Sequence, residues 1–192
     1  MPLAGVSAIQ ALVEHIKLKK GQKILIHGGA GGIGSIAVQI AKFLGAYVVA
    51  TVRGDDLEYV KSLGADEAID YRTEDFTQKI HGFDAVFDTV GGKTTDKSFK
   101  VLKKGLPAGR QGGIIVSMAG EPSAALAKKY SVRAIGQNTE GNSARLTRLA
   151  QLVLSGKVVP QVDKVFSLKE VKNAFKHAES GHPRGKVVLQ LN

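Results

Sequence analysis

Residues 24–34 read ILIHGGAGGIG, so a short apolar run passes directly into a glycine-rich turn. The stretch 36–44 follows with its apolar residues at helical spacing. The pattern Gly-x-Gly-x-x-Gly therefore lies between a predicted strand and a predicted helix, an arrangement that binds the pyrophosphate of a dinucleotide. A flexible glycine loop is the plainer alternative, and the strand-turn-helix context favours the binding turn.

Each glycine of the turn has an expected role. Gly29 allows the tight turn, Gly31 lets the backbone approach the phosphates, and Gly34 lets the helix pack close to the strand. Free amides of the first helical turn and the positive end of the helix dipole then face the anion. The cofactor-binding residues predicted in the turn are Gly29, Ala30, Gly31, Gly32, Ile33 and Gly34.

The composition is that of an ordinary globular protein and excludes several kinds of site. Of 192 residues, 43% are hydrophobic and 23% charged, and none is cysteine. The chain therefore has no disulfide, no thiol nucleophile and no cysteine-ligated zinc. The five histidines show no metal-ligand spacing, so we expect no metal site.

The net charge of +10 raises the question of a nucleic-acid or membrane partner. The basic residues are dispersed and no recognised nucleic-acid module accompanies them, so we expect neither partner. The sequence shows no secretory signal and no apolar run of the ~20 residues that a membrane span requires. A cytoplasmic protein is the simplest expectation.

Apolar periodicity predicts alternating strands and helices. The expected strands are 23–28, 47–52, 67–70, 84–88, 113–118, 131–136, 165–166 and 186–191. The expected helices are 3–18, 33–44, 55–63, 73–80, 94–102, 143–155 and 168–179. This alternation favours an α/β fold, a doubly wound parallel Rossmann sheet with flanking helices. We divide the chain into a leading helix (1–20), a dinucleotide-binding domain (21–160) and a C-terminal helix and strand (161–192).

The end of the second strand indicates which dinucleotide is bound. A carboxylate at this position holds the ribose of NAD and repels the 2′-phosphate of NADP. Here the strand ends in Arg53, whose guanidinium can hold a phosphate, so NADP (NADPH) is the predicted cofactor. Asp55 and Asp56 are expected to cap the next helix. If Asp55 faces the ribose instead, the preference reverses.

Two further strands end in polar, glycine-containing turns at the edge where open α/β sheets bind ligands. Thr89, in the turn after the fourth strand, can offer a hydroxyl to the cofactor; the alternative is a local turn capped by Asp88. Met118 and Ala119 follow the next strand and are expected near the nicotinamide, although Met118 can equally fill the core.

With these motifs the chain resembles the medium-chain dehydrogenase/reductase superfamily, in its zinc-independent, quinone-oxidoreductase-like, NADPH-dependent branch. The resemblance rests on residues 2–8, 27–34, 62–66, 69–72, 88–91 and 180–189. It implies that Ser7 faces the nicotinamide side, that Tyr71 flanks the adenosine beside Arg53, and that Thr89 and Met118 line the length between.

The resemblance also implies what the chain does. In that family a GroES-like catalytic domain precedes the helix that here starts near Pro2, so the chain looks like the cofactor-binding half of an oxidoreductase that transfers hydride to a quinone, enone or other small carbonyl compound. The C-terminal helix and strand would return to that absent domain. Strand 186–191 would expose an edge through which a homodimer could form.

Three points stay open. No catalytic residue is assigned, because no tyrosine has a lysine one helical turn later. A non-catalytic NADP-binding module, acting as sensor or scaffold, fits equally well, whereas a methyltransferase is disfavoured by Arg53. Residues 106–112 are expected to form an exposed extra loop.

Overall fold

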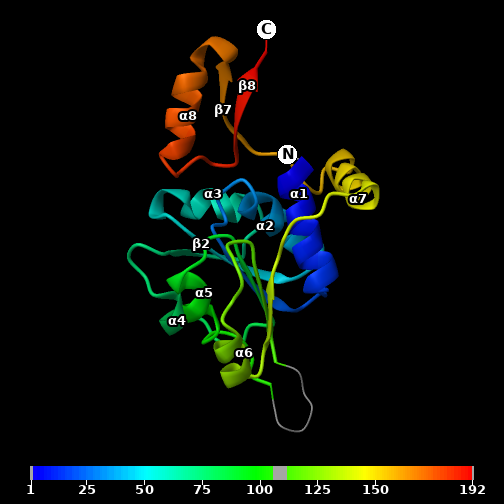
Figure 1. Cartoon of the computed structure of the whole chain (residues 1–192), viewed down its shortest axis with the longest axis vertical. Helices are drawn as coiled ribbons and strands as arrows, with labels where there is room; N and C mark the ends of the chain where they lie inside the picture. The colour runs from blue at the N-terminus through cyan, green and yellow to red at the C-terminus, as the bar shows by residue number, and fades with distance from the viewer. Residues whose placement is uncertain (1, 106–111, 192) are drawn as a thin grey trace.

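A six-stranded parallel sheet forms the centre of the molecule (Figure 1). The computed structural model describes residues 2–105 and 112–191, so most of the loop expected at 106–112 lies outside the described residues. The strands are β1 (Lys23–His27), β2 (Tyr47–Val52), β3 (Glu67–Asp70), β4 (Ala85–Asp88), β5 (Ile114–Ser117) and β6 (Arg133–Gly136). Their spatial order is β3-β2-β1-β4-β5-β6, which confirms the doubly wound α/β prediction.

Both faces of this sheet are buried, and alternate residues of each strand point to opposite cores. In β1, Ile24 and Ile26 belong to one hydrophobic cluster and Leu25 to the other. In β4, Phe87 and Val86 divide in the same way. Burial on both faces explains why these strands read as nearly continuous apolar runs.

Helices cover the two faces in two groups (Figure 1). The first face carries α1 (Pro2–Ile9), the π-helical segment η1 (Gln10–His15), α2 (Gly34–Phe43), α3 (Leu57–Ser62) and α7 (Ser143–Leu154). The second face carries α4 (Phe76–Lys79), α5 (Lys93–Ser98) and α6 (Ala124–Tyr130). We call residues 2–158, with this sheet and these helices, the body.

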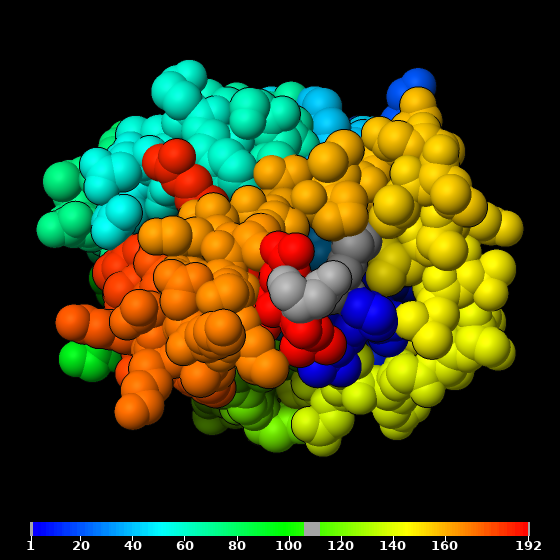
Figure 2. Space-filling view, turned by 90° about the horizontal axis from the view of Figure 1, so that it is seen from above, coloured from blue at the N-terminus to red at the C-terminus, as the bar shows by residue number. Residues whose placement is uncertain are grey.

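The C-terminal residues 162–191, which we call the tail, form a separate small unit. Strands β7 (Val162–Ser167) and β8 (Lys186–Gln190) pair in parallel, with η3 (Leu168–Glu170) and α8 (Val171–Glu179) between them. Ser167 and Glu170 form a capping box at the start of η3. Seen from above, the tail, in orange and red, lies between the cyan residues around α3 and the yellow residues around α7 (Figure 2).

Several predicted elements differ in length or kind. The leading helix 3–18 is an α-helix only to Ile9 and continues as the π-helical η1. Helix 73–80 starts at Phe76, because Asp75 accepts a hydrogen bond from the Thr77 amide and serves as its N-cap. Helix 94–102 ends at Ser98, after which Phe99 and Val101 turn into the core. Helix α6 was not predicted, and it buries no residue completely.

Candidate functional site

A cavity of about 770 Å³ lies at the carboxyl ends of β1 and β4, where the strand order reverses. Its walls come from the glycine turn, the end of β2, residues 71–76, the turn after β4 with the start of α5, and tail residues 181–183. Ligands of open α/β sheets bind in this crevice. The cavity therefore coincides with the site that the glycine motif predicts.

The glycine turn is too tight for side chains at two positions. Gly28, and not Gly29 as predicted, makes the tight turn with a φ of +71°, a backbone conformation that favours glycine. A Cβ on Gly34 would collide with the carbonyl oxygen of Gly28, so α2 packs against the turn itself. Gly31 lines the cavity, and no side chain caps the start of α2. The cavity wall thus includes Gly31, which precedes the uncapped start of α2, the kind of helix start at which anions bind.

Arg53 lies in the cavity wall with hydrogen-bonding capacity to spare. Its Nε is buried and has no hydrogen-bond partner among the described residues. The Asp55 carboxylate is 3.2 Å away, close enough for an ion pair but outside hydrogen-bond geometry. Because an unsatisfied buried donor is costly, this guanidinium is suited to an incoming anion.

The two carboxylates after Arg53 do not cap α3 as expected. Asp56 occupies the N-cap position, but its side chain accepts no hydrogen bond from the helix. Instead Asp56 is buried and bonds to Arg184 of the tail. The Asp55 side chain is 71% exposed and does not line the cavity. The expected caps were wrong because Arg53 and Arg184 compete for these carboxylates.

His27, at the end of β1, is a fully buried part of the cavity wall. Ser98 Oγ donates to the Thr94 carbonyl at 2.7 Å, so it accepts from His27 Nε2 at 2.9 Å. Nδ1 then accepts from the Thr51 hydroxyl, also at 2.9 Å. Burial outweighs the nearby Asp88 charge and lowers the pKa of His27 to about 4. The neutral ring thus links β1, β2 and α5 beneath the cavity.

The turn after β4 uses its polar side chains locally. Asp88 accepts hydrogen bonds from the amides of Val90 and Gly91 and pairs with the Thr95 hydroxyl. The Thr89 hydroxyl donates to the His27 carbonyl at 2.8 Å, while Thr89 also lines the cavity. Asp88 therefore caps this turn and Thr89 lines the cavity, while a contact of Thr89 with the cofactor stays a prediction.

Sequence reasoning missed three basic residues of the cavity wall: Arg72, Lys93 and Lys97. Lys93 and Lys97 are one helical turn apart on α5, immediately after the turn that follows β4, and this spacing is the signal that could have identified them. Lys97 also pairs with Asp75 at 3.2 Å. Together with Arg53 these residues place four basic side chains in a wall that also holds the carboxylates of Asp56, Glu74 and Asp75. The basic side chains are the groups that suit phosphates.

Other predicted site residues do not line the cavity. The structure brings Ala30, Gly31, Arg53, Tyr71 and Thr89 together around it, but not Ser7, Gly29, Gly32, Ile33, Gly34, Met118 or Ala119. Met118 packs against the core. Ser7 is buried in α1, where its hydroxyl donates to the Leu3 carbonyl and lies 2.7 Å from the Thr139 hydroxyl.

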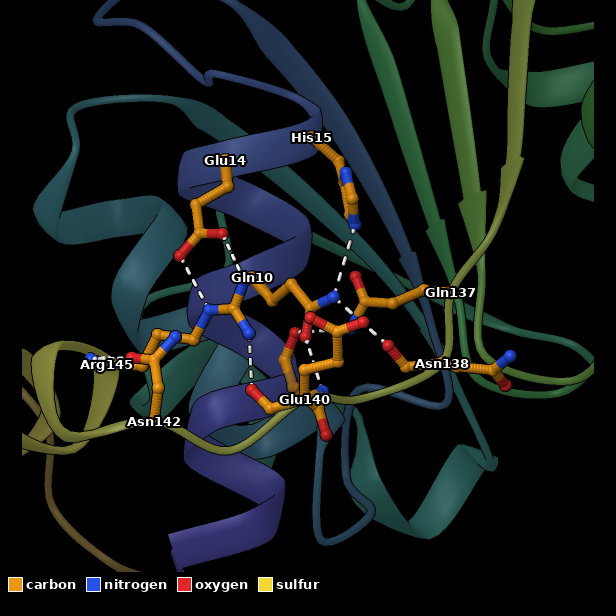
Figure 3. Close-up of polar contacts among 9 residues, drawn as sticks. Gln10, Glu14, His15, Gln137, Asn138, Glu140, Asn142 and Arg145 are labelled. Atoms are coloured by element: carbon orange, nitrogen blue, oxygen red, sulfur yellow. Dashed lines mark hydrogen bonds and ion pairs between the residues drawn. The ribbon is translucent and has the colours of Figure 1, made fainter.

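Ser7 belongs to a polar network between the N-terminal helix and the loop after β6. Figure 3 shows Gln10 between these segments, where it donates to the Asn138 carbonyl and accepts from the Glu140 amide. Arg145 binds both carboxylate oxygens of Glu14. This network fixes the position of η1 against the loop after β6.

Among the described residues, no helix is long and apolar enough to cross a membrane. Nor do residues 2–105 and 112–191 contain a group of three His, Cys, Asp or Glu side chains that could hold a metal ion.

Comparisons with known proteins agree with this architecture. A family model for zinc-binding dehydrogenases matches residues 63–189. A 2-methylene-furan-3-one reductase of Solanum lycopersicum is 37% identical over 98% of this chain and 45% of its own length. A chloroplastic NADPH-dependent alkenal/one oxidoreductase of Arabidopsis thaliana is 36% identical, with the same coverage.

Among solved structures, the quinone oxidoreductase from Coxiella burnetii matches with a TM-score of 0.88 and 35% identity, over 100% of this chain and 59% of that one. The chain spans about half the length of the curated relatives it matches.

Proposed function

The chain belongs to the zinc-binding dehydrogenase family, and from this premise we propose that it forms the NADPH-binding portion of an oxidoreductase. The complete enzyme would transfer hydride to a quinone, enone or other small carbonyl compound. The names of the similar reductases support this class of substrate. The substrate itself depends on a pocket that the cofactor half alone does not define.

The observation that carries the proposal is the pairing of an anion-binding turn with a cationic pocket. Gly31, three residues before the uncapped start of α2, and Arg53, whose buried Nε has no hydrogen-bond partner among the described residues, both line the cavity. A dinucleotide with a 2′-phosphate supplies anions for both places. The residues present therefore fit NADPH.

Each part of the cavity has a role in this proposal. The turn from Gly29 to Gly34 would hold the pyrophosphate through backbone amides, and Arg53 would hold the 2′-phosphate. Tyr71, which is 53% exposed and lines the cavity, would flank the adenine. Thr89, Met118, Ala119 and Ser7 are proposed along the path to the nicotinamide. When bound, the cofactor supplies the hydride.

The tail is proposed to contact a catalytic domain outside this chain. Val165 of β7 and Phe175 of α8 are 52% and 62% exposed, which is unusual for apolar residues in such a small unit. A GroES-like domain, expected from the family resemblance, would cover them. The same exposed strands could instead pair two copies of the chain in a homodimer.

Zinc-independent chemistry is also part of the proposal, despite the name of the family. The chain has no cysteine to ligate zinc. A cytoplasmic location stays a prediction, and one similar reductase is chloroplastic.

A second candidate is a non-catalytic NADP-binding module that acts as a redox sensor or scaffold. It is supported by the absence of a lysine one helical turn after any tyrosine, which leaves the chain without an evident activated phenol. Turnover of a quinone by the 192-residue chain would favour the enzyme; cofactor binding without turnover would favour the module or a need for the missing domain.

Fluorescence titration of the chain with NADPH and with NADH tests the proposal. We expect NADPH to bind at least about tenfold more tightly, because Arg53 adds a charge-assisted interaction with the 2′-phosphate. Arg53→Ala should remove that difference while leaving NADH binding nearly unchanged. Equal affinity of the wild-type chain for both cofactors would contradict the assignment of NADPH.

A further inference from the structure

The tail is bonded to the part of the cavity where the predicted 2′-phosphate site lies. The Gly185 amide donates to the Ala30 carbonyl at 3.0 Å, which ties the start of β8 to the glycine turn. The preceding residue, Arg184, reaches the loop after β2. Residues 181–183 line the cavity directly. The C-terminal segment is therefore one wall of the cofactor site.

Arg184 makes three contacts with the loop and helix after β2. Its Nε donates to Asp56 Oδ1 at 2.6 Å, and its Nη2 donates to the Asp55 carbonyl, also at 2.6 Å. The guanidinium lies 5.3 Å from the centre of the Tyr59 ring, within range of a cation–π interaction. The pairing with Asp56 raises the pKa of Arg184, so its charge is fixed at all physiological pH values.

Asp56 is the carboxylate that this contact neutralises. It lines the cavity together with Arg53, and only 6% of its side chain is exposed. Its amide donates to the Arg53 carbonyl at 2.8 Å, so the two residues are held close together. An unpaired carboxylate here would repel a 2′-phosphate and could accept a hydrogen bond from a free ribose hydroxyl.

We propose that Arg184 is a specificity-determining residue for the cofactor: by holding and neutralising Asp56, it lets the cavity accept a 2′-phosphate at Arg53. This inference rests on the proposed NADPH-binding function. It assigns to the tail a role in cofactor choice, although the residue lies 128 positions from Asp56 in the chain. Arg184 acts through Asp56, so it is a positioning residue.

The sign of the effect follows from the charges. With Arg184 present, Asp56 and Arg184 form a neutral pair, and Arg53 is ion-paired with Asp55, whose side chain is 71% exposed and does not line the cavity. Without Arg184, the Asp56 carboxylate stays in the wall and offsets the charge of Arg53. The 2′-phosphate of NADPH then loses attraction, whereas the 2′-hydroxyl of NADH does not.

The test measures the ratio of NADPH to NADH affinity for the 192-residue chain and four variants. We expect Arg184→Met to weaken NADPH about tenfold and NADH less than about twofold. Arg184→Lys keeps the charge and should retain the wild-type affinity ratio within about threefold. The double variant Arg184→Met with Asp56→Asn removes both charges, and it should bind NADPH within about threefold of the wild-type affinity. Arg145→Met removes an ion pair with Glu14 that does not line the cavity, and it should leave the ratio unchanged.

Three results would overturn the inference: an equal loss of both cofactors in Arg184→Met, an unchanged ratio, or no recovery in the double variant. Circular dichroism establishes that each variant is folded. If Arg184→Met does not fold, Asp56→Asn alone decides, because it should raise the NADPH to NADH ratio about threefold and an unmoved ratio would refute the proposal. A wild-type chain without preference for NADPH would refute the proposed function itself, whereas a preference that survives Arg184→Met refutes only the role of Arg184.

Discussion

The body and the tail contain the same kinds of element but bury them very differently. Every residue of β4 is buried, whereas only Phe166 is buried in β7 and none in β8. Helix α2 buries most of its residues, whereas α8 buries only Ala174. The body closes two cores around its sheet, while the tail has a single strand pair covered by one helix.

This difference shows which part of the chain is structurally self-sufficient. A sheet with helices on both faces buries its own apolar surface. A two-stranded sheet packed by one helix buries less, and here it leaves Val165 and Phe175 more than half exposed. The tail is bonded to the body through Arg184 and Gly185. The proposed catalytic domain would cover the exposed residues.

The largest effect is expected from breaking the glycine turn of the body. In Gly34→Ala the new Cβ would collide with the Gly28 carbonyl and push α2 away from the cavity. We expect NADPH binding to weaken about a hundredfold or more, because several charge-assisted hydrogen bonds are lost together. Fluorescence titration measures the loss.

Gly141→Ala is the matched control, since a Cβ at Gly141 meets nothing within 4 Å. It should bind NADPH like the wild-type chain. Normal NADPH binding by a folded Gly34→Ala variant would show that the turn does not hold the cofactor.

A pair of core substitutions should separate the stability of the body from that of the tail. Leu25 is fully buried in β1, and Leu25→Ala is expected to lower the free energy of unfolding by about 3 kcal/mol in urea titrations.

Phe166→Ala should leave the urea midpoint of the body unchanged, because we expect the tail to open separately from the body. Hydrogen exchange should then be faster in residues 162–191 alone. A common shift of all amides in Phe166→Ala would mean that body and tail unfold as one unit.

The buried His27 should make the body lose stability in acid. The pKa of His27 is lowered to about 4 in the folded chain. At pH values between about 6.5 and about 4, the histidine is therefore protonated in the unfolded chain but neutral in the folded chain. Stability is therefore complete at neutral pH and falls as the pH decreases toward 4. From about pH 7 to about pH 5 we expect a loss of about 2 kcal/mol in the free energy of unfolding. His27→Gln, which cannot titrate, should lose this component; an identical pH dependence in both proteins would exclude His27 as its source.

The body was predictable from sequence because its signals are local. The glycine turn, the apolar runs of the strands and the position of Arg53 at the end of β2 all lie within short segments, and the alternation of strands with helices predicts a parallel sheet. The cavity wall was only partly predictable. The bond between Arg184 and Asp56 and the hydrogen bonds of His27 to Thr51 and Ser98 join distant residues that no periodicity relates. Helix α6 escaped prediction because it is short and half-exposed, so it has no clear apolar stripe.

The most direct test of the central claim uses only the adenosine end of the cofactor, which the chain, body and tail together, should bind without any other domain. Isothermal titration of the 192-residue chain with adenosine 2′,5′-bisphosphate and with adenosine 5′-monophosphate isolates the contribution of the 2′-phosphate. The account predicts that the bisphosphate binds at least about tenfold more tightly and that Arg53→Ala abolishes the difference. Equal binding of the two nucleotides by the wild-type chain would contradict it.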